Sequence, residues 1–216
     1  MRAFRNLIVG LVLTTSFAIA SPITIAALGD SLTAGYGLPQ QDGFAPQLEA
    51  WLRAQGADVV VLNAGVSGDT TAGGLSRVNW TLTPDVDAMI VALGGNDYLR
   101  GLDPAVSRKN LSGILAAAQQ ADVEVLLVGL SAGANYGPDY QQEFSGMYRD
   151  LATEYRLLLY PSWFEGLRPE AETQDQMLGF MQADGIHPNA QGVSKIVAAM
   201  GPSVLALING LDATRP

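Results

Sequence analysis

Short apolar runs alternate along the chain with segments whose apolar residues recur at helical spacing. Five of these runs are β-branched in places and bounded by Gly, Asn or Pro, which is typical of strands buried on both faces. They are residues 23–28, 59–62, 89–93, 123–130 and 157–160. Strand–helix alternation over a chain of this size predicts one doubly wound parallel sheet of the α/β class. No linker or repeat divides residues 21–216, so we expect a single domain.

The segments between the runs have the periodicity of amphipathic helices. Four sets of apolar residues recur at spacings of three and four. They are Phe44, Leu48, Trp51 and Leu52; Leu111, Ile114, Leu115 and Ala118; Tyr140, Phe144, Met147 and Leu151; and Val193, Ile196, Val197 and Met200. Asp103 and Pro104 supply a cap and a first-turn proline for the second set. Pro202 is expected to kink or divide the last helix.

The first twenty residues have the features of a secretory signal peptide. Arg2 and Arg5 precede an apolar run at residues 7–19, and Ala18-Ile19-Ala20 forms an A-x-A cleavage site. This run is shorter than the roughly 20 residues that span a bilayer. No later segment is expected to be apolar for long enough to cross a membrane, so we predict no stable membrane insertion. We expect cleavage after Ala20 and a periplasmic or secreted protein.

Composition and charge exclude several classes of function. The chain has no cysteine, which excludes disulfides, thiol nucleophiles and cysteine-ligated metal sites. Its 21 acidic and 12 basic residues give a net charge of −9, and such a surface repels phosphate backbones. We therefore expect no nucleic-acid partner. The single histidine is His187, so any reaction that needs an imidazole must use it.

Polar, glycine-rich motifs follow several of the predicted strands or precede the last helix. They are Gly29-Asp30-Ser31-Leu32, the segment 63–70, Gly94-Gly95-Asn96-Asp97 and the segment 184–189. Open parallel sheets bind their ligands beyond the carboxyl ends of the strands. If the sheet is built in this way, the four motifs lie together and form one site.

The motifs contain the residue types that acyl transfer requires. A serine hydroxyl needs an adjacent base, and a carboxylate must hold the imidazole in the correct tautomer. Ser31 stands where the first strand meets its helix, and Asp184 lies three residues before His187. The backbone N–H groups of Ser31 and Gly68 and the side-chain amide of Asn96 are candidate donors to an oxyanion.

Each of these features also has a structural interpretation. A lone histidine is usually structural or exposed, and Gly-rich segments after strands are usually turns. Asp30, Asp69 and Asp97 are expected to cap helices or tie loops rather than orient the imidazole. Residues 129–133 match the G-x-S-x-G elbow of α/β-hydrolases, with Ser131 as nucleophile. That fold usually places a strand and a helix between acid and histidine, for which too little chain follows Ser131.

Taken together, the four motifs resemble the four sequence blocks of the SGNH (GDSL-type) hydrolase family. The resemblance extends from about residue 23 to the final helix, and is greatest to the group of periplasmic arylesterase, acyl-CoA thioesterase I and lysophospholipase L1. Segments 29–37, 67–70, 94–101 and 134–137 support that group. The resemblance implies a flavodoxin-like three-layer α/β/α sandwich with a five-stranded parallel sheet, and no metal or cofactor.

Carried over by position, the resemblance implies Ser31 as nucleophile, His187 as base and Asp184 as its partner. It also implies an oxyanion hole formed by the N–H groups of Ser31 and Gly68 and the side chain of Asn96.

The resemblance bears on the substrate pocket as well. The loop before Ala134 often carries proline in this group, whereas this chain has Ser131-Ala132-Gly133, which leaves chain-length preference open. We place Asn135 and Tyr136 beside the pocket. Four apolar residues precede the Asp–His loop and either line an acyl groove or pack in the core. They are Met177, Leu178, Phe180 and Met181.

We therefore expect a monomeric serine hydrolase that acts through an acyl-enzyme on small-molecule carboxylic esters and thioesters of small or fatty acyl groups. One alternative is a carbohydrate acetylesterase that acts on envelope or extracellular polysaccharide. A second alternative is a non-catalytic module that binds lipid or glycan.

Overall fold

Five parallel strands form one sheet in the order β2-β1-β3-β4-β5. The computed structural model describes residues 21–170 and 173–212, so the predicted signal peptide at residues 1–20 lies outside the described residues. The strands are β1 (Ile23–Gly29), β2 (Val59–Gly65), β3 (Ala88–Ala92), β4 (Glu124–Val128) and β5 (Leu158–Tyr160). The five predicted strands and the parallel sheet are confirmed, with small shifts at the strand ends.

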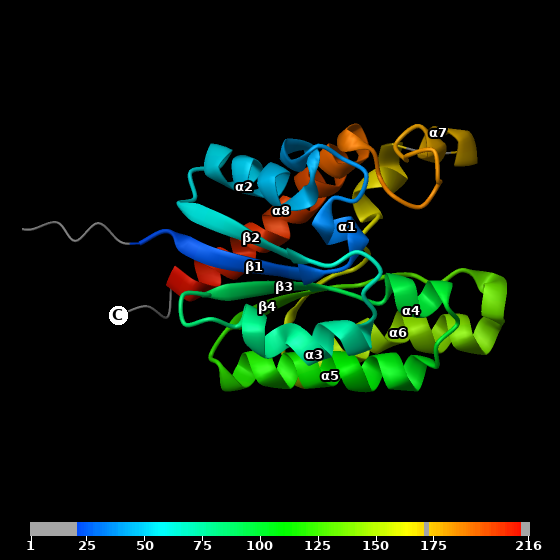
Figure 1. Ribbon diagram of the computed structural model, residues 1–216, viewed down its shortest axis with the longest axis horizontal. Coiled ribbons are helices and arrows are strands. Elements are labelled where there is room, and N and C mark those ends of the chain that lie inside the picture. Colours follow the sequence, from blue (N-terminus) through cyan, green and yellow to red (C-terminus); the bar gives the residue numbers. More distant parts are fainter. Residues whose placement is uncertain (1–20, 171–172, 213–216) are drawn as a thin grey trace, which may run out of the picture.

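Helices cover both faces of the sheet and complete a three-layer α/β/α sandwich (Figure 1). One face packs against α2 (Phe44–Ala54) and α8 (Ala190–Asp212). The other face packs against α3 (Thr71–Thr81), α5 (Pro104–Gln120) and α6 (Pro138–Tyr155). The predicted fold class is confirmed.

Three short helices gather at the carboxyl ends of the strands, at the right of Figure 1. They are α1 (Ser31–Ala34), α4 (Gly95–Leu99) and α7 (Gln174–Leu178). Three 3₁₀ helices complete the connections, at Gln40–Asp42, Ala134–Tyr136 and Glu165–Glu170. The candidate site residues are therefore presented at one edge of the sheet.

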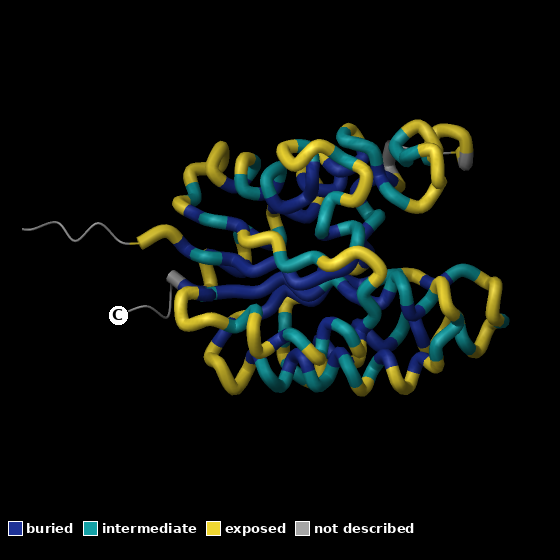
Figure 2. Tube along the Cα trace, in the orientation of Figure 1, coloured by how far each residue is buried: buried dark blue, intermediate teal, exposed yellow. Residues whose placement is uncertain are grey.

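The sheet is buried on both sides because its strands are apolar along most of their length. In β1, Ile25 and Ala27 pack with the core beneath α2 and α8, whereas Ala26 and Leu28 pack with the core on the opposite face. Figure 2 shows the central strands as a buried layer between helices whose outer surfaces are exposed. Burial on both faces explains why these strands are continuous apolar runs rather than alternating ones.

Helix α8 differs in two ways from what the sequence pattern predicts. Its segment Ala190–Leu211 is long and apolar enough, by length and composition, to cross a membrane. The expectation that no later segment meets that test is therefore wrong. Val193, Ile196 and Met200 are buried in the sheet core, so the apolar character of α8 serves packing in this fold.

Pro202 does not divide α8, which is continuous through that position. Pro202 lacks the N–H that would bond the carbonyl of Ala198. Both residues lie on the exposed side of the helix, where water can satisfy that carbonyl. The helix is therefore not divided there, and a kink at Pro202 stays a prediction.

The sequence pattern also gave no indication of α3. Its buried residues are Thr71, Gly74 and Val78, which provide little apolar area. A Cβ at Gly74 would lie 2.2 Å from Leu93 Cδ1, so this helix approaches the sheet through a position without a side chain. Thr70 caps α3 by accepting a hydrogen bond from the Gly73 N–H at 3.3 Å.

Candidate active site

Ser31 is the first residue of α1 and directly follows the turn after β1. Asp30 precedes it and caps α1, because its Oδ1 accepts the Leu32 N–H at 3.0 Å. A Cβ at Gly29 would lie 2.0 Å from Thr33 Oγ1, so the turn requires glycine at that position. Ser31 Oγ is thereby held at the carboxyl edge of the sheet.

His187 approaches Ser31 from the loop between α7 and α8. Its Nε2 lies 2.9 Å from Ser31 Oγ, and its Nδ1 lies 2.6 Å from Asp184 Oδ2. Asp184 Oδ1 also accepts the N–H groups of Ile186 at 2.9 Å and His187 at 3.0 Å. These hydrogen bonds lower the pKa of Asp184 to about 2, and the one donated by the His187 N–H makes the largest contribution. An ionised carboxylate therefore faces the imidazole at neutral pH.

The loop that carries His187 is closed by backbone hydrogen bonds. The Gln182 N–H donates to the His187 carbonyl at 2.7 Å, and the Asn189 N–H donates to the Phe180 carbonyl at 2.9 Å. The Gln182 side chain also donates to the Tyr36 carbonyl at 2.8 Å. The Tyr36 ring lies with its centroid 4.6 Å from that of the His187 ring. These contacts fix the loop against the segment that follows the nucleophile.

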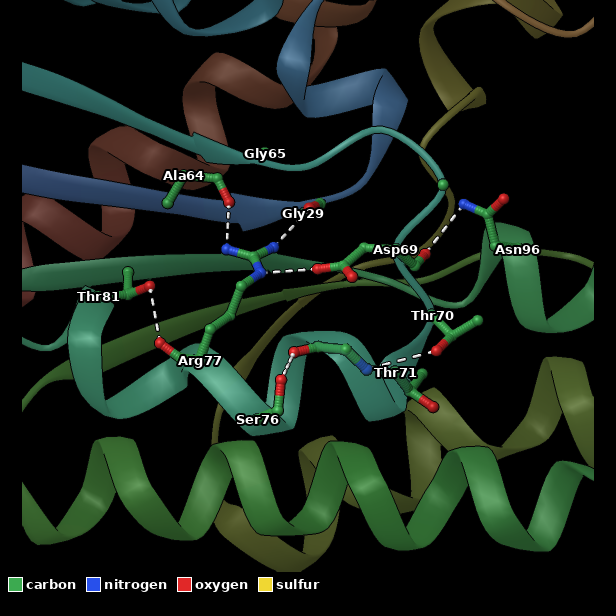
Figure 3. A network of polar contacts seen from close by, with 12 residues as sticks. Gly29, Ala64, Gly65, Asp69, Thr70, Thr71, Ser76, Arg77, Thr81 and Asn96 are labelled. Atoms are coloured by element: carbon green, nitrogen blue, oxygen red, sulfur yellow. Dashed lines mark hydrogen bonds and ion pairs between the residues drawn. The ribbon is translucent and has the colours of Figure 1, made fainter.

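Gly68 and Asn96 supply candidate donors near Ser31. Gly68 has φ +83°, a left-handed conformation that favours glycine. Asn96 Nδ2 donates to the Asp69 carbonyl at 2.9 Å, as Figure 3 shows. Because a primary amide carries two N–H donors, this bond orients Nδ2 and leaves its second hydrogen for another acceptor.

One cavity of about 670 Å³ joins these groups. Ser31, Gly68, Asn96 and His187 all line it. Most of the other lining residues are apolar or aromatic, namely Leu32, Tyr36, Tyr98, Leu99, Leu130, Phe164, Met177, Leu178, Met181 and Ile186. Small-molecule sites commonly have volumes of about 300–1,000 Å³ with apolar walls and few polar groups. The cavity thus suits an apolar group held beside a hydroxyl and an imidazole.

Residues 27–194 match the model of the GDSL-like lipase/acylhydrolase family. The chain belongs to this family. It is 37% identical over 199 residues to esterase TesA of Pseudomonas aeruginosa, and these residues cover 92% of this chain and 94% of TesA. It is 36% identical over 203 residues to thioesterase 1/protease 1/lysophospholipase L1 of Escherichia coli K12, covering 92% and 91%.

Solved structures agree with the family assignment. The psychrotrophic esterase EstA of a Pseudoalteromonas species, in a structure inhibited by monoethylphosphonate, superposes with a TM-score of 0.77. It shares 30% sequence identity with this chain, covering 86% of this chain and 98% of EstA. This GDSL-like protein is accordingly a serine esterase.

The three other aspartates of the site loops, Asp30, Asp69 and Asp97, make structural contacts. Asp97 is buried and accepts the Thr71 N–H at 2.8 Å, the Thr71 hydroxyl at 2.6 Å and the Ser107 hydroxyl at 2.9 Å. Asp69 pairs with Arg77 at 2.6 Å. Asp30 caps α1, and its burial raises the pKa of its carboxyl to about 6. These contacts fit the predicted capping and loop-tying roles.

Ser131 lines the same cavity as Ser31, but the His187 imidazole is hydrogen-bonded to Ser31. Its side chain is exposed and lines the cavity wall in the loop after β4. Among the described residues, the hydroxyl within hydrogen-bond distance of the His187 imidazole is that of Ser31. The G-x-S-x-G match at residues 129–133 therefore provides part of the cavity wall.

One of the four predicted pocket residues lines the cavity, and the other three do not. Met177 lines the cavity, whereas Asn135, Tyr136 and Phe180 are not among its lining residues. Tyr136 is exposed and packs edge-on against Tyr98, with 6.0 Å between ring centroids, so it contacts the wall through a lining residue. Phe180 packs against the core beneath α2 and α8.

Several lining residues were missed by sequence reasoning. Tyr98 and Leu99 directly follow the Asn96 motif, and Ile186 lies inside the Asp184–His187 segment, so proximity in sequence could have indicated them. Leu130 directly precedes Ser131 in the G-x-S-x-G match, whereas Phe164 comes from the loop after β5 and carries no such signal. Within residues 21–170 and 173–212, no cluster of three or more His, Cys, Asp or Glu side chains is placed to hold a metal ion.

Proposed function

We propose that Ser31, His187 and Asp184 hydrolyse carboxylic esters and thioesters of apolar acyl groups through an acyl-enzyme. The observation that carries this proposal is the continuous hydrogen-bonded chain from Ser31 Oγ through His187 to Asp184, beside an apolar cavity. A hydroxyl in contact with a carboxylate-oriented imidazole is the arrangement that activates serine as a nucleophile.

In the first step Ser31 Oγ attacks the acyl carbonyl carbon while His187 Nε2 takes the hydroxyl proton. The carbonyl electron pair moves to oxygen and forms a tetrahedral oxyanion. The N–H groups of Ser31 and Gly68 and Asn96 Nδ2 donate hydrogen bonds to that oxygen. Collapse of the oxyanion breaks the bond to the leaving alcohol or thiol, which takes the proton from His187 and departs.

In the second step water attacks the acyl-Ser31 ester while His187 Nε2 takes its proton. The tetrahedral species collapses, Ser31 Oγ recovers the proton, and the carboxylic acid leaves. Asp184 accepts the Nδ1–H throughout, which keeps Nε2 free to act as base and stabilises the imidazolium. A pKa of about 2 keeps Asp184 ionised throughout the neutral range.

The apolar wall of the cavity supports an acyl or aryl group as the recognised part of the substrate. The relatives are named esterase TesA, arylesterase and thioesterase 1/protease 1/lysophospholipase L1, and these names support both esters and thioesters. A polysaccharide would offer mainly hydroxyl groups to this surface, so we favour an apolar acyl substrate over an acetylated sugar.

The proposal is tested with Ser31→Ala, His187→Ala and Ser131→Ala on p-nitrophenyl esters from acetate to palmitate, on acyl thioesters and on acetylated xylan. We expect the first two variants to lose about 10⁴–10⁶-fold in kcat. Ser131→Ala should retain most of its activity and should still be labelled by a fluorophosphonate at Ser31. Full activity in either of the first two variants, or collapse only in Ser131→Ala, would contradict the assignment.

We also propose that residues 1–20 are a leader removed after Ala20, and that residues 21–216 form the single domain of a monomeric periplasmic or secreted enzyme. The basic start, the apolar run and the A-x-A site support this processing. Intact-mass analysis of protein from the native host should give a chain that begins at Ser21. A chain that retains residues 1–20 would contradict the proposal. Size-exclusion chromatography with light scattering should give the molar mass of one chain, and twice that mass would contradict the monomer.

A further inference from the structure

Arg77 on α3 makes three charge-assisted hydrogen bonds at the carboxyl edge of the sheet. Its Nε donates to Asp69 Oδ2 at 2.6 Å, its Nη1 to the Ala64 carbonyl at 2.7 Å and its Nη2 to the Gly29 carbonyl at 2.9 Å. Figure 3 shows its guanidinium between the ends of β1 and β2 and the loop that follows β2. A single side chain thus joins β1, β2 and the loop that carries Gly68.

The acceptors of Arg77 are neighbours of the proposed oxyanion donors. Gly29 lies two residues before Ser31, and Asp69 directly follows Gly68. The Asp69 carbonyl accepts Asn96 Nδ2 at 2.9 Å. A displacement of Asp69 would therefore move the Gly68 peptide and the Asn96 amide together. Arg77 itself is not among the residues that line the cavity.

The packing of α3 leaves room for this arrangement at Gly73. A Cβ at that position would lie 2.0 Å from Asp69 Oδ1, too close for any side chain unless Asp69 moved. The side chains of Arg77 and Asp69 are only 19% and 16% exposed, so water competes weakly for their hydrogen bonds. The lack of a side chain at Gly73 therefore leaves space for the Asp69 carboxylate, and Arg77 holds the carboxylate in that space.

We propose that Arg77 is a positioning residue that sets the geometry of the oxyanion hole through Asp69 and Gly29. This inference rests on the proposed function, because it needs an oxyanion at Gly68 and Asn96. Three acceptors surround one planar guanidinium, which presents five donors in a fixed fork, whereas a lysine ammonium is a compact charge on a flexible stem. Gly68 lies in a loop and has a positive φ, and glycine adopts many backbone conformations, so a contact that fixes this loop bears on the position of the Gly68 N–H.

The first test compares Arg77→Met, Arg77→Lys and Gly73→Ala with the wild type on a p-nitrophenyl ester. Misplacement of catalytic groups by about 1 Å costs on the order of 100-fold, so we expect kcat to fall about 10- to 100-fold in all three variants. KM should change by less than about threefold, because the cavity wall is unaltered. Arg77→Lys should recover little, since it restores the charge without the fork.

Arg108→Met is the matched control. It removes another arginine in an ion pair, with Glu154 at 2.7 Å between α5 and α6, away from the site. We expect wild-type kcat and KM in this variant. A purely structural role for Arg77 would lower the melting temperature and leave kcat unchanged in assays run well below that temperature.

The second test is a double-variant cycle with Asn96→Ala. If Arg77 acts through the donors of the hole, Arg77→Met costs much less in kcat when Asn96 is already absent. Fold-losses that simply multiply would overturn the inference. The rate of labelling by a fluorophosphonate, which forms a tetrahedral adduct at Ser31, should show the same dependence on Arg77.

The outcomes separate this inference from the proposed function. Activity that survives Ser31→Ala overturns both. An inactive Ser31→Ala variant together with wild-type kcat in Arg77→Met and Gly73→Ala overturns only the role of Arg77. If Arg77→Met does not fold, Gly73→Ala and Arg77→Lys decide the question, because each keeps a polar or charged group at position 77.

Discussion

The two halves of the candidate site are built in opposite ways. Ser31 follows a strand buried on both faces, and Asp30 beside it is only 3% exposed. His187 comes from a loop in which Asp184, Gly185 and Ile186 are all exposed. The nucleophile half is held by buried or partly buried side chains such as Asp97 and Arg77, whereas the base half is held mainly by backbone hydrogen bonds.

Two aspartates show what this difference does to the same functional group. Burial raises the pKa of Asp30 to about 6, while hydrogen bonds from the His187 and Ile186 N–H groups lower the pKa of Asp184 to about 2. Loss of water penalises the charged form, and donated hydrogen bonds favour it. In this fold the carboxylate that stays ionised beside the imidazole therefore lies on the exposed loop, and the carboxyl with the raised pKa lies in the interior.

Among the variants that compare the two halves of the site, Asp184→Asn is expected to have the largest effect on activity. An amide at this position favours the wrong imidazole tautomer, and the corresponding change in a Ser-His-Asp enzyme lowers kcat about 10⁴-fold. Because Asp184 is exposed, the melting temperature should stay within experimental error of the wild type. Steady-state kinetics and thermal denaturation check both results. A variant with near wild-type kcat would remove Asp184 from the mechanism.

Asp97→Ala should lower the stability of the protein, because Asp97 holds the nucleophile half of the site together. The change leaves the Thr71 N–H and the hydroxyls of Thr71 and Ser107 without their buried acceptor. We expect the free energy of unfolding to fall by about 3–5 kcal/mol, measured by urea denaturation. Asp103→Ala removes an exposed cap of α5, so it should cost only about 1 kcal/mol and serves as control. Equal losses in the two variants would contradict this account.

Asn96→Ala tests whether the nucleophile half of the site contributes to the reaction itself as well as to stability. Loss of one oxyanion donor typically costs about 10²–10³-fold in kcat, and we expect that loss with little change in KM. Asn209→Ala on the exposed side of α8 removes the same group and should leave both constants unchanged. If KM rises while kcat is preserved, Asn96 binds substrate in its ground state and is not an oxyanion donor.

Asp30 should make stability depend on pH in a defined window. The folded protein holds this proton up to about pH 6, whereas the unfolded chain releases it near 3.8. Between these values the folded state binds more protons, so the free energy of unfolding falls as pH rises. The total change is up to about 3 kcal/mol, since one pKa unit corresponds to about 1.4 kcal/mol.

Asp30→Asn keeps an oxygen to accept the Leu32 N–H but cannot ionise. Urea denaturation of this variant from pH 4 to 7 should lack the decline that the wild type shows over the same range. A decline of equal size in both proteins would assign the pH dependence to other groups.

The strands and the caps were predictable because they depend on short-range patterns. Continuous apolar runs, Asp103 before Pro104 and the single histidine are all visible in the linear sequence. The continuous course of α8 through Pro202 was not, because it depends on which side of the helix meets water. Helix α3 was missed for a related reason, since its sheet-facing side is built from small residues that carry no apolar periodicity.

By itself the sequence determined the sheet, the residue types of the site and its one available base, because these follow from local spacing and from counting. Only the tertiary structure decided that Ser31 and His187, 156 residues apart, lie 2.9 Å from each other. The same holds for Arg77, whose acceptors at Gly29 and Ala64 are backbone carbonyls. Every residue other than proline presents the same backbone donor and acceptor, so no sequence pattern marks the carbonyl that a distant side chain will reach.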